Sequence, residues 1–253
     1  MTQPLFTVLL ISHQKPILVN QAIQSVLNQT CRDFELLIVD SGALAPALRI
    51  AYDDCPFIRI EETGETPQTH KEHHVVSWLL NEWIPRASGK FITLLCDDDL
   101  YLPSYLQCFS DAMEPGCHCL WTGIYRARCD EKGENTEWLG MYPPQDKPKL
   151  GMKTDYLQLC HSKEAFLHMA KFCGGMCWPD LPGIRCGHDI LFMSGMANFF
   201  HFKTVRGFHA VNRRTPESVY CGSGTEPIPI FHDDAPLDSR ANAQTTGCTP
   251  SES

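Results

Sequence analysis

Three consecutive aspartates, Asp97, Asp98 and Asp99, follow the apolar run 91–95 after Cys96. The run is typical of a buried strand, so the acids are expected where that strand leaves the sheet. Adjacent carboxylates repel one another, and Asp oxygens are hard ligands suited to Mg²⁺ or Mn²⁺, ions that also hold substrate phosphates. The triplet therefore indicates a metal and phosphate site. The alternative is a solvated acidic turn before a helix that starts near Pro103.

Two more polar residues follow apolar runs. Ser12 follows the run 6–11, and Asp40 follows the run 34–39. Parallel strands bring their carboxyl ends to one edge of a sheet, where ligands of α/β proteins usually bind. We therefore expect these two residues to converge with the aspartate triplet.

The elements between these runs have helical periodicity. Apolar residues recur at helical spacing after Pro16, and shorter helical patterns cover 43–52 and about 70–87, with a short strand at 57–60 between them. The alternation of strand and helix over residues 5–100 predicts an α/β fold with a mainly parallel, doubly wound sheet.

The second half is less regular. We expect helices from 103 to about 113, at 163–172 after a Ser162 N-cap, and at 188–198, and strands at 119–125, 137–141 and 199–205. Residues 173–187 are rich in Gly, Pro and Cys and should be irregular. Residues 233–253 are polar and small, which predicts a disordered tail.

Composition narrows the function class. The chain has 253 residues, 43% hydrophobic, with a formal net charge of −9. An acidic balance argues against non-specific binding to nucleic acid, although Arg206–Arg214 could form a local basic patch. No apolar run approaches the length of a transmembrane helix, and the N-terminus lacks a signal peptide's basic region, so we expect a soluble, cytoplasmic protein.

The chain has 13 cysteines. An odd number without an export signal indicates reduced thiols. Cys173, Cys177, Cys186 and His188 could form a zinc site, but their spacing is not a paired CxxC arrangement, and buried structural cysteines are the alternative.

Several motifs occur in an order that resembles a known family. The segments 8–13, 22–30 and 33–40, followed by 87–92 and 96–103, look like the N-terminal half of family 2 glycosyltransferases with the GT-A fold. The likeness is specific over 5–106 and weaker over 107–215. There, the segments 188–192 and 199–202 resemble small bacterial enzymes of spore-coat polysaccharide synthesis, the SpsA-like type.

The resemblance implies a single Rossmann-like GT-A domain over residues 1–232, with a central, mostly parallel mixed sheet flanked by helices. Its nucleotide-binding half would span 5–106 and its acceptor-binding half 107–215, with the tail 233–253 outside.

The resemblance also implies roles for the triplet. Asp98 aligns with the aspartate that ligates Mn²⁺ or Mg²⁺, Asp99 would assist it, and Asp97 aligns with a residue that faces the ribose. Many relatives carry an acid where this chain has Cys96. Which two carboxylates form the working pair is therefore open.

The nucleotide site is implied in the same way. Asp40 aligns with an acid that contacts the base or ribose, Ile11 and Ser12 would frame the base, and His13 could stack on it. His70 lies where relatives often have a basic residue near the nucleotide. For Asp40 the alternative is a cap on the following helix, and for His70 a solvated helix start.

Asp189 aligns with the catalytic base, which would take the proton of the acceptor hydroxyl in a single displacement. The alternative is an acid in the first turn of a helix that complements the helix dipole.

Together these features predict a metal-dependent, inverting glycosyltransferase. It would move a hexose-type sugar from a nucleotide-diphosphate sugar, UDP- or dTDP-activated, to an acceptor hydroxyl. A non-catalytic nucleotide-sugar binding protein and a sugar nucleotidyltransferase are the alternatives. The nucleotidyltransferase would usually need a Gly-rich phosphate loop, which residues 12–15 do not provide.

The expected partners are the donor and a glycan or lipid-linked glycan acceptor. A lipid-linked acceptor would be reached from the membrane surface, since no transmembrane segment is expected. The acidic net charge argues against a nucleic-acid acceptor.

Overall fold

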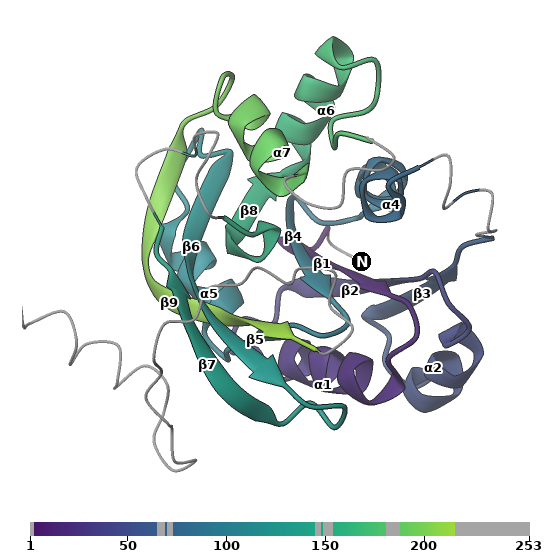
Figure 1. Ribbon diagram of the computed structural model, residues 1–253. Coiled ribbons are helices and arrows are strands. Elements are labelled where there is room, and N and C mark those ends of the chain that lie inside the picture. Colours follow the sequence, from purple (N-terminus) through teal and green to yellow (C-terminus); the bar gives the residue numbers. More distant parts are fainter. Residues whose placement is uncertain are drawn as a thin grey trace, which may run out of the picture.

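A computed structural model describes residues 3–64, 69, 73–144, 148, 154–180 and 188–215. Within them, nine strands form one mixed sheet in the order β3-β2-β1-β4-β8-β6-β9-β5, with β7 paired to β6 (Figure 1). The strands are β1 (Phe6–Ser12), β2 (Phe34–Asp40), β3 (Ile58–Glu62), β4 (Phe91–Cys96), β5 (Leu100–Tyr101), β6 (Cys119–Cys129), β7 (Asn135–Tyr142), β8 (Leu159–Ser162) and β9 (Phe202–Arg214).

The helices lie on both faces of the sheet. They are α1 (Pro16–Leu27), α2 (Ala45–Tyr52), α4 (Val75–Trp83), α5 (Tyr105–Ala112), α6 (Lys163–Phe172) and α7 (His188–Met196), with 3₁₀ turns η1 (Ile84–Arg86) and η2 (Tyr156–Gln158). Figure 1 shows α1 and α2 on one side of the sheet and α4, α6 and α7 on the other.

Alternation along the buried strands produces these two layers. Val8 and Leu10 belong to the cluster that contains α1 and α5, whereas Leu9 and Ile11 belong to the cluster that contains α4, α6 and α7. Successive side chains of a strand point to opposite faces, so an unbroken apolar run is what a sheet covered on both faces requires.

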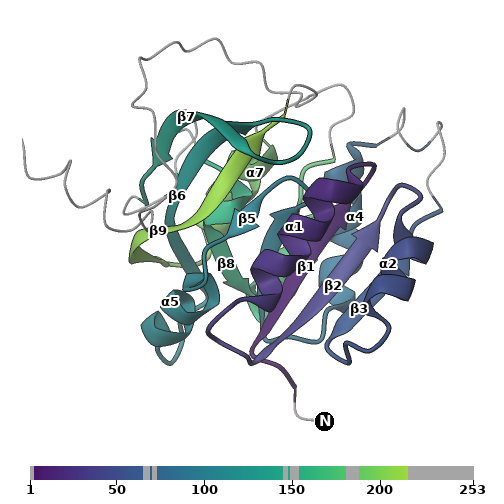
Figure 2. The same cartoon turned by 90° about the horizontal axis from the view of Figure 1, so that it is seen from below.

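The two halves of the sheet differ in strand direction. β1, β2, β3 and β4 pair in parallel, as predicted, and Figure 2 shows β1, β2 and β3 side by side. In the second half, β8 pairs antiparallel with β4 and β6, and β9 pairs parallel with β6. The α/β class with a mixed sheet is thus confirmed, and the expectation of a doubly wound parallel sheet holds for the first half.

Some boundaries were wrong. The strand predicted at 199–205 is β9, which begins at Phe202 and extends to Arg214, and β6 extends to Cys129. The helix predicted over 70–87 is α4 followed by η1 in the described part of that range. β5 and β8 were not predicted. Among the described residues, no helix is long and apolar enough to cross a bilayer.

Candidate active site

The carboxyl ends of β1, β2 and β4 meet at one edge of the sheet. Ser12 pairs in register with Asp40, and Ile11 with Cys96, the last residue of β4. The backbone N–H of His13 donates to Asp97 Oδ2 over 3.1 Å. The predicted convergence of these strand ends is therefore confirmed.

The loops that follow β1 and β2 touch backbone to backbone. A Cβ atom added to Gly42 would lie 1.9 Å from the carbonyl oxygen of His13. A glycine is needed at this crossing because any side chain would push the two strand ends apart.

Asp97 and Asp98 share a cation supplied by the chain itself. Lys15 Nζ lies 2.6 Å from Asp98 Oδ2 and 3.4 Å from Asp97 Oδ1. Burial alone would lower the pKa of Lys15, but the charges of Asp98 and Asp97 outweigh it and raise that pKa. Burial and the charge of Asp98 raise the pKa of Asp97, and Lys15 partly offsets the rise. Lys15 is thus a positively charged partner for both carboxylates.

Asp99 turns the opposite way, into the interior. It is 1% exposed, and its Oδ1 accepts hydrogen bonds from the side chain of Asn212 at 3.2 Å and the backbone N–H of Arg213 at 2.9 Å. Burial, then the charges of Asp98 and Asp155, raise its pKa well above the ordinary value. In these contacts Asp99 ties β9 to the aspartate turn, and its role as a metal ligand stays a prediction.

Arg213 fixes the other side of this turn. Its guanidinium donates to the carbonyl oxygen of Asp98, to Gln21 Oε1 at 2.5 Å and to the carbonyl oxygen of Gly133 at 2.9 Å. The side chain is buried, so the arginine expected in a basic surface patch instead holds together α1, the β6–β7 turn and the aspartates.

Cys96 stands where many relatives carry an acid. Its half-buried thiol accepts a hydrogen bond from the hydroxyl of Tyr156 at 2.6 Å, and burial and the neighbouring aspartates raise its pKa. A neutral thiol in this position adds no further negative charge to the triplet.

Asp189 lies in the first turn of α7, half-buried. Burial, followed by the charge of Asp155, raises the pKa of Asp189 to about 7, and Arg214 acts against the rise. A carboxyl group that titrates near neutral pH is suited to accept a proton and release it again.

The start of α7 is held by histidines. The His188 ring stacks on His74, with ring centroids 3.5 Å apart and the planes at 14°. Burial and the neighbouring His188 lower the pKa of His74 to about 4. The His74 ring in this stacked pair is therefore neutral at physiological pH. His74 also caps α4, and its backbone N–H donates to Asp180 at 2.6 Å.

Asp155 connects the two groups of acids, and sequence reasoning missed it. It caps η2 by accepting from the N–H of Leu157 at 3.0 Å, and it is 6% exposed. Its charge raises the pKa of both Asp99 and Asp189, and Asp98 in turn raises the pKa of Asp155. Arg214 and Arg126 counter this charge. The capping pattern Asp155-Tyr156-Leu157-Gln158 was the available signal.

The three residues predicted to frame or stack on the nucleotide base differ in their exposure to solvent. Ile11 and Ser12 are buried, whereas His13 is exposed, with Nδ1 3.1 Å from Ser41 Oγ. His70 lies outside the described residues. The roles of these residues stay predictions.

Asp40 is completely buried. Its carboxylate accepts hydrogen bonds from the N–H groups of Leu44 at 2.8 Å and Ala45 at 2.7 Å, and from Ser12 Oγ at 3.1 Å. These contacts give Asp40 the helix-capping role left open by the sequence. A direct contact with a nucleotide stays a prediction.

Asp40→Ala is expected to lower the free energy of unfolding by about 2 kcal/mol, because the N–H groups of Leu44 and Ala45 at the start of α2 lose their acceptor. Equilibrium urea denaturation measures the change, with Asp54→Ala, at an exposed position, as the control. A loss no larger than that of the control would remove the capping role.

The candidate zinc ligands that the structure describes, Cys173, Cys177 and His188, do not form a metal site. The part of the chain that the structure describes contains no group of three or more His, Cys, Asp or Glu side chains placed to hold a metal ion. The Cys177 thiol donates to the carbonyl oxygen of Phe166 at 3.4 Å, whereas Cys173 is exposed. Cys186 lies outside the described residues. Cys177 thus has the buried structural role.

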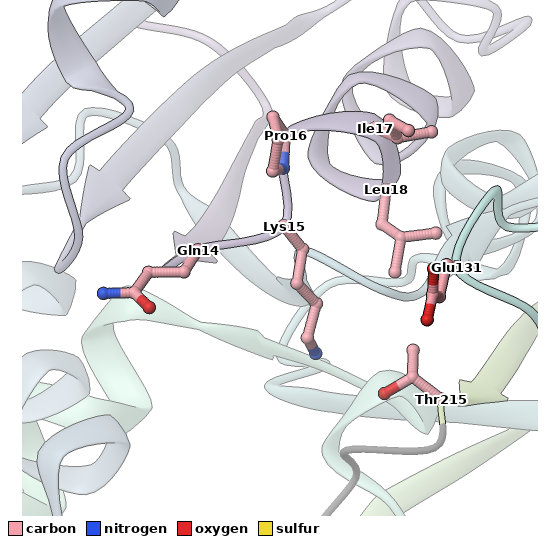
Figure 3. A pocket seen from close by; sticks show the side chains of 7 residues that line it. All are labelled: Gln14, Lys15, Pro16, Ile17, Leu18, Glu131 and Thr215. Atoms are coloured by element: carbon pink, nitrogen blue, oxygen red, sulfur yellow. The ribbon is translucent and has the colours of Figure 1, made fainter.

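A pocket of about 180 Å³ adjoins the Lys15 ion pair. Figure 3 shows Lys15 among the side chains that line it, together with Leu18, Glu131 and Thr215. The lining residues come from the start of α1, the β6–β7 turn and the end of β9. The pocket is therefore built by both halves of the chain.

Comparison with known proteins identifies relatives. The family model for glycosyl transferase family 2 matches residues 7–170. Protein CgeD of Bacillus subtilis is 24% identical over 218 residues, which cover 84% of this chain and 50% of that protein. An uncharacterized glycosyltransferase of Rickettsia bellii is 29% identical over 118 residues, 46% of this chain and 16% of that protein. The chain thus spans half or less of these relatives.

Solved structures share the fold. S. aureus TarS residues 1–349 in complex with UDP-GlcNAc has a TM-score of 0.58 and 13% identity, covering 83% of this chain and 58% of that one. The mannosyltransferase PcManGT from Pyrobaculum calidifontis, in complex with GDP-Man and Mn²⁺, has a TM-score of 0.57 and 13% identity, covering 88% and 59%.

Proposed function

The chain belongs to glycosyl transferase family 2 and has the GT-A fold, and from this premise we propose that it is a metal-dependent, inverting glycosyltransferase. It would transfer a sugar from a UDP- or dTDP-sugar to an acceptor hydroxyl, with a glycan or lipid-linked glycan as acceptor. The whole protein's substrates and partners belong to this proposal.

One observation carries the proposal. Asp97 and Asp98 direct oxygens at one positive centre at the edge of the sheet, and the charge of Asp98 acts on Asp155, whose charge in turn raises the pKa of the candidate base Asp189. A glycosyl transfer needs both functions at the same site, because charge develops on the leaving diphosphate while the acceptor loses a proton.

The residues present fit a divalent cation. Asp97 and Asp98 already direct oxygens at one positive centre, the Lys15 ammonium, which stands in for a cation. Mg²⁺ and similar ions are usually held by one or two carboxylates, with substrate phosphates and water completing the shell. Such an ion supplies Lewis-acid stabilisation of the leaving diphosphate. PcManGT, with the same fold, was solved with Mn²⁺ and GDP-Man.

Asp189 would perform the proton transfer. The acceptor oxygen attacks the anomeric carbon as the bond from that carbon to the phosphate oxygen breaks, and the nucleoside diphosphate leaves with the bonding pair. Asp189 takes the hydroxyl proton, and a single displacement inverts the anomeric centre. A half-buried carboxylate with a raised pKa is basic enough for this role.

A donor screen tests the proposal. UDP-, dTDP- and GDP-sugars are added with and without Mn²⁺, and the melting temperature is followed, since a ligand of the native state raises stability. Mass spectrometry then follows donor hydrolysis and transfer to model glycans. A nucleotide sugar that binds without any turnover would favour a non-catalytic binding protein.

The rate of transfer is expected to rise as pH increases through about 7, because Asp189 acts as a base only when deprotonated. Asp155→Asn removes a neighbouring negative charge, lowers the pKa of Asp189 and should move the midpoint to lower pH. Asparagine keeps an oxygen for the N–H of Leu157, so η2 stays capped. A pH profile of kcat measures this, and an unchanged midpoint would contradict the coupling.

A further inference from the structure

Lys15 has a fixed backbone at the start of α1 and a side chain that pairs with two aspartates following β4. It is the residue before the first turn of α1, where Pro16 follows it and its carbonyl accepts from the N–H of Val19 at 2.9 Å. Its backbone is therefore fixed, while its ammonium reaches across to Asp98 and Asp97. The side chains of Lys15, Asp97 and Asp98 are 26%, 8% and 14% exposed, so this contact is partly desolvated and stronger than an exposed ion pair.

The ammonium and a divalent cation cannot both occupy the position between Asp97 and Asp98. The ammonium nitrogen lies 2.6 Å from Asp98 Oδ2 and 3.4 Å from Asp97 Oδ1. A Mg²⁺ ion ligated by both of these oxygens would lie about 2.1 Å from each of them, in the place that the ammonium now fills. Steric overlap and the repulsion between the two positive charges therefore make these two states exclusive.

A pocket beside Lys15 leaves space for its side chain to move away from the aspartates. It lines the pocket between the start of α1, the β6–β7 turn and Thr215, and its side chain is partly exposed, so its flexible stem can turn without repacking the core (Figure 3). The diphosphate of a donor bound over this edge would offer the displaced ammonium a new anionic partner.

We propose that Lys15 competes with the divalent cation for the Asp97–Asp98 pair and is released onto the donor diphosphate, so that metal and donor bind cooperatively. This inference rests on the proposed function and adds to it a residue that couples the two ligands. Without donor, Lys15 pairs with the two carboxylates and the metal ion binds weakly. With donor, the Lys15 ammonium pairs with the diphosphate and the metal ion pairs with Asp97 and Asp98.

The test measures Mn²⁺ binding by the full chain, using the electron paramagnetic resonance signal of the free ion. K15M should bind Mn²⁺ alone about tenfold more tightly than wild type, within the usual range for coupled sites. K15M/D98N should lose that gain. K90M is the matched control: Lys90 is exposed and precedes β4, about 20 Å from the aspartates by strand rise, so its affinity should equal that of wild type.

The same titrations are repeated with saturating UDP. In wild type UDP should raise the Mn²⁺ affinity, and in K15M this increase should be smaller, because no ammonium has to be displaced. K15Q replaces K15M if the latter gives no folded protein by thermal unfolding.

The outcomes distinguish the competition between Lys15 and the metal ion from the coupling between metal and donor. A Mn²⁺ affinity of K15M at or below that of wild type would overturn the competition, as would the absence of Mn²⁺ binding in both. Equal UDP effects in wild type and K15M would overturn the coupling. If UDP bound to none of the variants while K15M kept its gain, the proposed donor would fail and the competition for metal would stand.

Discussion

Replacing Asp189 with asparagine is expected to lower the rate of sugar transfer by about a thousandfold while leaving donor binding intact. Asparagine has nearly the same shape but cannot accept a proton at physiological pH. The acceptor hydroxyl would then have to attack without a base. Donor affinity should be retained because the carboxylates proposed to bind the cation, Asp97 and Asp98, follow the end of β4 and are not on α7.

The matched control for this variant is Glu164→Gln. Glu164 occupies the first turn of α6, as Asp189 occupies that of α7, and it is exposed. If Asp189 served only the helix dipole, both variants would cost a few tenths of a kcal/mol in stability and neither would change kcat. Single-turnover transfer rates and donor titrations distinguish the two, and full turnover by the Asp189 variant would remove it from the base role.

The first half of the fold could be predicted because its signals are local. β1, β2 and β4 are apolar runs covered on both faces, and the polar residue that ends each run, such as Asp40 or Asp97, marks the edge of the sheet. Parallel pairing alone determines that the carboxyl ends of these strands lie at the same edge of the sheet. This is why the convergence of Ser12, Asp40 and the aspartates could be predicted without any knowledge of the second half.

The second half could not be predicted as well, because its strands depend on partners distant in sequence. β8 has four residues and no periodic pattern, and it forms only between β4 and β6. The end of β9 carries Asn212, Arg213 and Arg214, polar residues that would suggest a surface. Asp99 provides hydrogen-bond acceptors for the first two, and that partner is more than a hundred residues away.

The directions in which the three aspartate side chains point also could not be predicted from the sequence. Three identical residues in a row look alike, yet Asp97 and Asp98 face Lys15 while Asp99 faces β9. The family resemblance assigned Asp98 and Asp99 to the metal, whereas the geometry brings Asp97 and Asp98 to one cation. Lys15 itself precedes α1 without any motif, so its role appears only once β1 and β4 lie side by side.

Asp98→Ala is expected to abolish Mn²⁺-dependent donor binding or to reduce turnover on the order of a thousandfold, because Asp98 supplies the oxygen nearest the cation position. The fold should persist. Asp97 remains 3.4 Å from Lys15, so no buried charge is left without a partner, and the Asp98 carbonyl that Arg213 uses is backbone. A substitution of Asp99 differs in this respect, because it would remove the hydrogen bonds that Asn212 and the backbone N–H of Arg213 donate to Asp99 Oδ1.

Donor titrations with and without Mn²⁺, followed by turnover measurements, check this result, with thermal unfolding to confirm that the variant is folded. Asp111→Ala, an exposed acid on α5, is the control and should match wild type in every assay. Near-wild-type activity of Asp98→Ala in Mn²⁺ would refute the assignment of the cation to this carboxylate. Activity lost in Mn²⁺ with donor affinity unchanged would instead limit Asp98 to the chemical step, where the leaving diphosphate gains its charge.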